Sequence, residues 1–404
     1  LKLYDWLAGS LRIGNSELLG KDEVVSQLPS IKQKGLKGGV RYYDGQFDDA
    51  RLAINLAQTA TEYGATVVNY MEAVEITKDN NQQITGLLIK DALTQKAYPI
   101  QAKIVINATG IFVDDILKMD SEVHKNLVRP SQGSHLVIDK KFLGSNDALM
   151  IPETSDGRVL FGVPWHDKVL LGTTDIPINE HEIEPIPLEQ EIAFILSTAE
   201  NYLNPAPKRE DVLSIYAGLR PLAAPSDKNG TSTKEISRDH KLIQSDSGLI
   251  TITGGKWTTY RKMAEATVDL AIKTGELREL KCRTKDLAIH GSSGKGHQAD
   301  WGYYGCDYPL IQQLIEQNPA LGEALVSGYP FTAAEVVWAA RHEMIEKVED
   351  FLARRCRLLL LDAKASVQAA PKVAEIMAEE LNKSSEWVQN EIKQYTELAN
   401  RYML

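Results

Sequence analysis

One short stretch of the chain combines the features of an anion-binding turn. Residues 251–263, TITGGKWTTYRKM, run from a β-prone apolar segment through a Gly-Gly pair and a lysine into a helix-compatible segment. Backbone N–H groups at a helix start point toward a bound anion, and the helix dipole favours negative charge there. Gly254, Gly255 and Lys256 are therefore predicted to face a negatively charged group, although such a lysine can also be solvated surface charge.

Three further side chains have types suited to binding or proton transfer. Arg220, in YAGLRPL, stands among apolar residues, and a buried guanidinium needs an anionic partner. That partner is either an internal carboxylate or a phosphate or carboxylate of a ligand, and the local sequence leaves both open. Arg238, in EISRDH, has Asp239 beside it as a structural partner. His135, in SQGSHLVID, suits removal of a hydroxyl proton, although a lone histidine is more often structural.

A second glycine turn follows the apolar run VINATG at residues 105–110. Ala108 and Gly110 offer little steric bulk, so the backbone can approach a dinucleotide there, and a tight turn after a core strand is the simpler alternative. HGSSGKGH lacks the Ser or Thr that a P-loop needs after Gly-Lys. RHEMIE has Glu346 in place of the second zinc-binding histidine, so no metal site is predicted.

The elements that must position these residues can be read from periodicity. A helix is predicted from Asp48 or Asp49 to a stop at Gly64, followed by a strand at residues 66–70. Residues 72–101 alternate β-rich runs with polar turns, as in an antiparallel meander. From residue 128 to 253 short β-like runs surround one helical stretch at 188–203, which indicates a mixed or antiparallel sheet with a helical cover.

The predicted division of the chain follows these changes of pattern. The predicted segments are residues 1–45, 46–120, 121–248 and 249–278. A Gly/Ser-rich linker occupies 279–307, and a separate α-helical domain occupies 308–404.

Composition limits the classes of function. The 404 residues suggest two or three domains, and the net charge of −10 argues against a nucleic-acid binder. Three widely spaced cysteines form neither a disulfide framework nor a metal site, which favours a reducing compartment. No run approaches the ~20 apolar residues that span a bilayer.

The combination of motifs resembles the FAD-dependent glycerol-3-phosphate dehydrogenase family. The matching stretches run along almost the whole chain in family-like order: YDWLAG, GGVRYYDGQFDDARL, VINATG, RPSQGSHLVID, GVPW, LLGTTD, YAGLRPL, ISRDHKL, TGGKWTTYRKMAE and RHEMIEKVEDFLARRCRLLLLD. The resemblance implies an α/β fold of the D-amino-acid-oxidase-like FAD-dependent class with an α+β substrate sheet. It further implies a substrate domain at residues 1–45 and 121–248, portions of an FAD domain at 46–120 and 249–278, and a C-terminal α-helical domain at 308–404.

The resemblance further implies oxidation of sn-glycerol 3-phosphate to dihydroxyacetone phosphate, with electrons passed to a quinone. It places Arg220, Arg238 and Lys256 around the substrate phosphate and His135 near the C2 hydroxyl, where His135 is the preferred base and an arginine such as Arg220 the rival. A helix start with a lysine would stabilise the negative charge of a reduced flavin. Contacts to FAD are implied for Ala73, Val74, Ala108, Thr109, Gly110, Gly254, Gly255, Lys256, Trp257, Thr258 and Thr259.

The chain departs from the family in one respect. The family's strand, G-x-G-x-x-G turn and helix do not occur here, so we expect an N-terminally truncated fold without a βαβ-containing segment of about 100 residues, and weak or no FAD binding. A cytoplasmic, membrane-peripheral homodimer is implied by the resemblance alone. The alternatives are a glycerol-3-phosphate oxidase using oxygen, a related oxidase of another small acid, or a non-catalytic scaffold.

Overall fold

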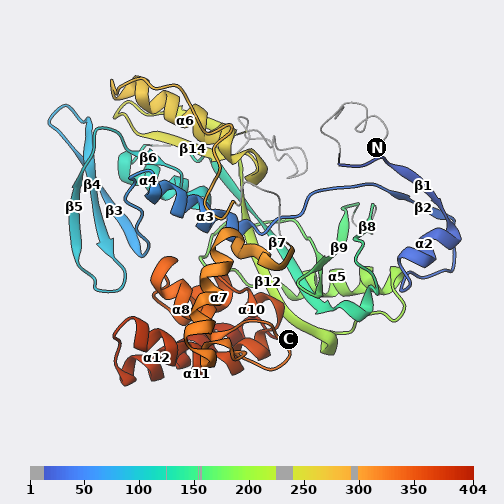
Figure 1. Cartoon of the computed structure of the whole chain (residues 1–404). Helices are drawn as coiled ribbons and strands as arrows, with labels where there is room; N and C mark the ends of the chain where they lie inside the picture. The colour runs from blue at the N-terminus through green and yellow to red at the C-terminus, as the bar shows by residue number, and fades with distance from the viewer. Residues whose placement is uncertain (1–12, 124, 153, 155–156, 224–239, 293–298) are drawn as a thin grey trace.

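The structure is a computed structural model that describes residues 13–404 apart from 124, 153, 155–156, 224–239 and 293–298. Three small sheets and a six-stranded sheet form a mixed α/β body, and the C-terminal helices gather on one side of it (Figure 1). The six-stranded sheet lies centrally, between the β3–β5 sheet and the N-terminal hairpin.

The six-stranded sheet is antiparallel throughout. Its order is β8-β9-β10-β7, with β11 also pairing β7, and β12 pairs the other edge of β7. The strands are β7 (Val128–Asp139), β8 (Leu149–Ile151), β9 (Leu160–Trp165), β10 (Lys168–Gly172), β11 (Ile176–Pro177) and β12 (Val212–Ala223). The two long strands β7 and β12 run side by side over their whole length.

One face of this sheet is covered by helix α5 (Glu189–Tyr202). Leu136 and Ile138 of β7 are fully buried against Ile192 and Ile195 of α5 in one apolar cluster. Because side chains alternate along a strand, His135 and its same-face neighbours must point to the opposite side. The predicted sheet with a helical cover is confirmed for residues 128–223, whereas the β-like run at 250–254 belongs to a different sheet.

A smaller sheet joins distant parts of the chain. Its order is β13 (His240–Gln244), β14 (Ile250–Gly254) and β6 (Ile106–Asn107), and β14 pairs β6 in parallel. Each parallel strand leads through a short 3₁₀ turn into a helix, α4 (Val113–Asp120) after β6 and α6 (Tyr260–Thr274) after β14. The strand–turn–helix unit predicted at residues 251–263 is therefore present, and the strand and turn predicted at residues 105–110 also lead into a helix.

The predicted meander is also present, as β3 (Met71–Lys78), β4 (Ile84–Asp91) and β5 (Ala97–Gln101). The predicted strand at residues 66–70 is wrong, because β3 begins only at Met71. Asn69 donates a hydrogen bond to the Met344 carbonyl, and Tyr70, with φ +56°, bonds Asp350. These contacts with the helical region, rather than a neighbouring strand, fix the segment.

Helix α3 (Asp49–Glu62) begins as predicted, because the Asp48 side chain accepts a hydrogen bond from the Arg51 N–H. Gly64 follows its end with φ +88°, a conformation that suits glycine. The N-terminal hairpin comprises β1 (Glu17–Gly20) and β2 (Gly38–Arg41), with α2 (Lys21–Gln27) between them.

The C-terminal region is helical, as predicted. It contains α7 (Tyr308–Gln317), α8 (Ala333–His342), α9 (Val348–Arg354), α10 (Leu358–Leu361), α11 (Ala363–Glu380) and α12 (Ser385–Asn400). Phe351, Leu358 and Val373 are fully buried in its main core. Tyr304, within the predicted linker, packs on Trp338 of α8, and the proposed domain boundaries stay a prediction. Among the described residues, no helix has the length and apolar character needed to cross a membrane.

Candidate functional site

His135 lies on the sheet face opposite α5, between two neighbouring strands. Its register partners are Gly172 on β10 and Tyr216 on β12. The Tyr216 ring stacks on the imidazole, with centroids 5.3 Å apart and planes at 21°. A Cβ at Gly172 would come within 2.3 Å of the imidazole Cδ2, so only glycine leaves room for the ring.

The surroundings of His135 keep the imidazole neutral. Burial, followed by the nearby charge of Arg220, lowers the pKa of His135 from 6.5 to about 4. No hydrogen bond from a described residue contributes to this shift. A neutral imidazole at physiological pH has a nitrogen lone pair free to accept a proton, which is the state a general base needs.

Arg220 lies on the same face of the sheet, four residues after Tyr216 on β12. Its Nη2 donates to Thr173 Oγ1 at 2.9 Å and its Nη1 to the Thr174 carbonyl at 3.2 Å. Asp175 Oδ1 lies 3.6 Å from Nη1 and also accepts a hydrogen bond from Ser131. The Arg220 side chain remains 36% exposed, so its guanidinium is held by protein and is still open to a ligand.

A buried hydrogen-bond network on the other face holds this part of β7 in place. Glu191 of α5 accepts hydrogen bonds from Gln132 Nε2 at 2.7 Å and from the Thr174 hydroxyl. Thr174 Oγ1 in turn accepts from the Ser134 N–H at 2.8 Å. The strand that carries His135 is thereby tied to the segment whose carbonyl binds Arg220, which fixes the spacing of the two side chains.

The second group of predicted residues lies where the parallel strands β6 and β14 end. Asn107 is buried and holds the first turn, because its Nδ2 donates to the Val113 carbonyl at 3.0 Å and its Oδ1 accepts from Thr109. Gly110 has φ +64°, and Gly254 and Gly255 have φ +75° and +76°. Ala108 and Thr109, which lie between Asn107 and Gly110, are exposed.

These turns fit part of an FAD site. Parallel strand ends that lead into helix starts form the crevice where such folds bind dinucleotides. A Cβ at Gly110 would meet no atom of the residues that the structure describes within 4 Å, so its turn has room for a ligand to approach. Lys256, Trp257, Thr258 and Thr259 are exposed at the start of the turn before α6, where the N–H groups carry partial positive charge.

Ala73 and Val74 lie on β3, in the meander sheet. A bulge interrupts the register of β3 between Ala73 and Glu75, which leaves Val74 as the extra residue. A bulge frees backbone hydrogen-bonding groups, as a contact between backbone and cofactor requires. Ile76 of the same strand packs against Val105, just before β6, so the two regions adjoin.

The structure brings some of the predicted residues together. His135 and Arg220 share one sheet face, and β12 contacts both β14 and the turn Gly110–Phe112. The Leu127 and Val128 N–H groups donate to Asp114 of α4, which anchors the start of β7 beside that turn.

Two predicted substrate-binding residues are not joined to this pair. Lys256 forms no ion pair with any residue that the structure describes, and it lies on the smaller sheet's turn rather than on the face of His135. Arg238 lies outside the described residues.

Sequence reasoning did not single out Tyr216, Gly172 or Thr173. Tyr216 stands in the same YAGLRPL run as Arg220, at even spacing, so the period of a strand would have placed both on one face. The contacts with Gly172 and Thr173 depend on the pairing of β10 with β7, for which the sequence contains no local signal.

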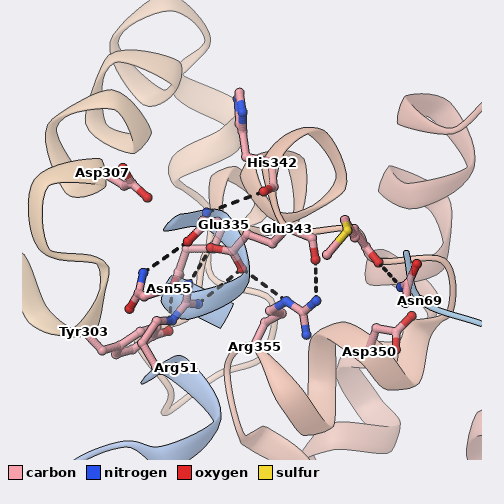
Figure 2. A network of polar contacts seen from close by, with 12 residues as sticks. Arg51, Asn55, Asn69, Tyr303, Asp307, Glu335, His342, Glu343, Asp350 and Arg355 are labelled. Carbon is pink, nitrogen blue, oxygen red and sulfur yellow. Dashed lines mark hydrogen bonds and ion pairs between the residues drawn. The ribbon is translucent and has the colours of Figure 1, made fainter. Parts of the chain in front are cut away.

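A second concentration of buried charge joins α3 to the helical region. Figure 2 shows Arg51 of α3 and Arg355 reaching Glu343, whose carboxylate is fully buried. Arg51 Nη1 donates to Glu343 Oε1 at 2.5 Å, and its guanidinium lies over the Tyr304 ring. Nearby, His290 contacts Glu62 at 2.6 Å and Asp307 at 2.8 Å.

A surface hollow of about 380 Å³ opens beside the start of α3. None of the predicted site residues lines it; its walls are Gln46, Phe47, Asp48, Lys140, Asn146, Pro164, Trp165, His166 and Asp167. Asp48 is held there by Arg357, with which it forms an ion pair. The hollow is therefore separate from the face that carries His135 and Arg220.

Comparison with known proteins identifies relatives of the whole chain. Residues 1–261 match the family of FAD dependent oxidoreductases, and residues 282–388 match the C-terminal domain of alpha-glycerophosphate oxidase. The mitochondrial glycerol-3-phosphate dehydrogenase of Arabidopsis thaliana is 39% identical over 100% of this chain and 69% of its own length. The human mitochondrial enzyme is 37% identical over 100% of the chain and 58% of its own length.

Solved structures agree with this relationship. The glycerol-3-phosphate dehydrogenase from Bacillus halodurans, solved with FAD, aligns with a TM-score of 0.81 and 27% identity over 95% of this chain and 79% of that chain. L-alpha-glycerophosphate oxidase from Mycoplasma pneumoniae shares the fold, with a TM-score of 0.51 and 17% identity over 69% of each chain. On these matches the chain belongs to the FAD-dependent glycerol-3-phosphate dehydrogenase family, with the D-amino-acid-oxidase-like fold and the C-terminal helical domain expected for it.

Proposed function

We propose that this protein oxidises sn-glycerol 3-phosphate to dihydroxyacetone phosphate with FAD as cofactor and passes the electrons to a quinone. The relatives are named glycerol-3-phosphate dehydrogenases, and the chain spans 58% to 69% of the length of those described above. The observation that carries the proposal is the pairing of an unprotonated His135 with the Arg220 guanidinium on one sheet face.

Arg220 and His135 have different roles, one in binding the substrate and the other in proton transfer. Arg220 binds the substrate phosphate through its guanidinium fork, a geometry that suits phosphate better than a point charge does. His135 accepts the proton of the C2 hydroxyl at a ring nitrogen, so that the alcohol carbon can become a carbonyl. Tyr216 holds the imidazole by stacking and keeps water from that side of the ring.

FAD, when bound, accepts the hydride that leaves C2. The residues that would hold it are the exposed turns at Ala108–Gly110 and Gly254–Thr259, together with the bulge at Val74. Lys256 and the start of α6 supply positive charge for an electron-rich ring. Arg238 is proposed as a second phosphate ligand by resemblance alone.

The electron acceptor and the assembly are finer parts of the proposal. We infer a quinone acceptor and a homodimer that associates with the cytoplasmic face of a membrane, all by resemblance to the family. An oxygen-using oxidase is the rival function, and hydrogen peroxide formation distinguishes it.

The test measures the activity of the FAD-loaded protein with sn-glycerol 3-phosphate. We expect reduction of a short-chain quinone with little peroxide under air. Turnover with oxygen at a rate similar to that with the quinone would show an oxidase instead of a dehydrogenase. Absence of turnover with either acceptor, in protein that contains FAD, would contradict both functions and favour a scaffold.

A further inference from the structure

Two glycines face each other in the middle of the two longest strands. Gly133 of β7 and Gly218 of β12 are direct register partners. The pair lies between the row of His135 and Tyr216 and the row of Ser131 and Arg220. Glycine in a strand interior weakens the strand and often marks a place where a ligand approaches closely.

The backbone does not require glycine at either position. Among the described residues, neither Gly133 nor Gly218 belongs to the glycines with positive φ. A side chain would therefore fit the backbone conformation of β12 at position 218, and any need for glycine there concerns space rather than strain.

The two glycines differ in what covers them. A Cβ at Gly133 would come within 2.4 Å of Arg220 Nη2, so the guanidinium lies directly over this residue. A Cβ at Gly218 would meet no atom of the described residues within 4 Å, and the residue is exposed. The result is a hollow one residue wide, bordered by the Tyr216 and His135 rings on one side and by Arg220 on the other.

A second observation points to a ligand in this hollow. The imidazole of His135 is only partly buried, neither of its nitrogens is a buried unpartnered atom, and no hydrogen bond from a described residue reaches the ring. A ring nitrogen on this face is therefore available to a ligand hydroxyl. A small ligand lying over Gly218 would supply a hydroxyl to His135 at one end and an anionic group to Arg220 at the other.

We propose that Gly218 is the floor of the substrate site, and that its missing side chain limits the site to a short phosphorylated polyol. The inference rests on the proposed function and adds a specificity-determining residue to the same site. Same-face rows are about 7 Å apart along a strand, and the Arg220 guanidinium lies back over Gly133, beside Gly218. The gap between the guanidinium and His135 is therefore one that a short ligand fills. Any side chain at position 218 would occupy the space of the substrate carbons.

The test replaces Gly218 by Ala and by Val in the FAD-loaded protein. Gly218→Ala should raise KM for sn-glycerol 3-phosphate about 10- to 100-fold, since one misplaced methyl group in a small site has effects of this size. Gly218→Val should remove saturation. FAD content and Tm should equal those of the wild type, because the new methyl group meets no protein atom.

Gly45→Ala is the matched control, because a Cβ there also meets nothing within 4 Å and the residue lies in a loop away from β12. It should leave KM unchanged. Binding is measured independently as the rise in Tm on addition of sn-glycerol 3-phosphate, which should be lost in Gly218→Val. An unchanged KM and an unchanged rise in Tm in both Gly218 variants would overturn the inference while leaving the proposed function intact.

A third variant separates the hollow from Arg220 itself. Gly133→Ala places a methyl group against the guanidinium and should weaken phosphate binding only as long as Arg220 is present. In an Arg220→Lys background it should therefore add little, whereas Gly218→Ala should still raise KM. If Gly133→Ala and Gly218→Ala raise KM by the same factor in the Arg220→Lys background, the assignment is contradicted. If the wild type neither binds nor oxidises sn-glycerol 3-phosphate, the proposed function fails, and the inference fails with it.

Discussion

The sheet face around His135 and the interface between α3 and the helical region treat buried polar groups in different ways. At the interface, Arg51 is almost fully buried and its charge is met by Glu343 at 2.5 Å. On the sheet face, Arg220 stays partly exposed, with the Asp175 carboxylate 3.6 Å from its guanidinium, and His135 is next to glycines. The interface pairs its charges in the protein interior, whereas the charge of Arg220 lies at a surface that solvent or a ligand can reach.

The two histidines of these regions express the same difference. His290 lies between Glu62 and Asp307; burial opposes protonation, but the two carboxylates outweigh it and raise the pKa. His135 has the opposite shift, because burial and Arg220 lower its pKa. Buried charge with a complete set of partners indicates a structural role, whereas a neutral histidine beside an arginine indicates a role that a ligand completes.

The largest effect is expected from replacing His135, the proposed base on the sheet face. His135→Asn should lower turnover about 10²- to 10⁴-fold, the range typical for removal of a general base, while KM changes little. Steady-state kinetics of the FAD-loaded protein measure both. His342→Asn, on the exposed end of α8, is the control and should have no effect. A raised KM with normal turnover in His135→Asn would assign binding rather than proton transfer.

The interface should respond in stability instead of turnover. Glu343→Gln leaves the Arg51 and Arg355 charges without their shared carboxylate, and removal of one partner from a buried ion pair costs about 3–5 kcal/mol. Denaturant unfolding measures the loss. The matched change Glu380→Gln breaks a pair with the partly exposed Arg341 and should cost under about 1 kcal/mol. Similar losses for both would remove the distinction between the two pairs.

Arg220→Lys tests whether the guanidinium fork is needed or only its charge. We expect KM for the phosphorylated substrate to rise about tenfold or more, because lysine cannot bind phosphate in a bidentate manner. Arg209→Lys, in an exposed pair with Glu189, serves as the control. If Arg220→Lys kinetics match the wild type, a simple point charge is sufficient at this position.

The smallest effect is a pair of opposite pH dependences. His135 has a folded pKa of about 4 against 6.5 in the unfolded chain, so the unfolded state gains a proton first as the pH falls. This group alone should lower the free energy of unfolding by about 1 kcal/mol between pH 7 and pH 5.5. His290, with a raised pKa, adds stability below 6.5 that is lost as the pH rises through its folded pKa.

Urea unfolding of the wild type, His135→Asn and His290→Asn at several pH values separates the two contributions. Stability of His135→Asn should fall less on acidification than that of the wild type. His290→Asn should instead lack the stability that protonation of His290 adds to the wild type below pH 6.5. Parallel curves for all three proteins would mean that neither histidine differs between its folded and unfolded states.

The sequence predicted those parts of the molecule that rest on local signals. The turns at Gly110 and Gly254, the start of α3 at Asp48 and the C-terminal helices all follow from periodicity, caps and glycines. The segment 66–70 was predicted wrongly because its β-prone residues are held by Met344 and Asp350, far along the chain.

The arrangement of the site could be predicted only in part. His135 and Arg220 were chosen by residue type, but their shared face depends on the register of β7 with β12. A shift of one residue would turn one of them to the side of α5. The hollow over Gly218 depends on that register and on the path of the Arg220 side chain, and neither has a local signature.

The outer edge of β12 has a further consequence. The Ile215 N–H donates to the Tyr402 carbonyl, so the helical region covers a backbone group that this strand edge would otherwise leave free. The Ser214 hydroxyl adds a side-chain hydrogen bond to the Leu359 carbonyl. Uncovered strands of this kind recruit strands of other molecules. Detachment of the helices would therefore expose a template for self-association, and the same event would disturb the strand that carries Tyr216, Gly218 and Arg220.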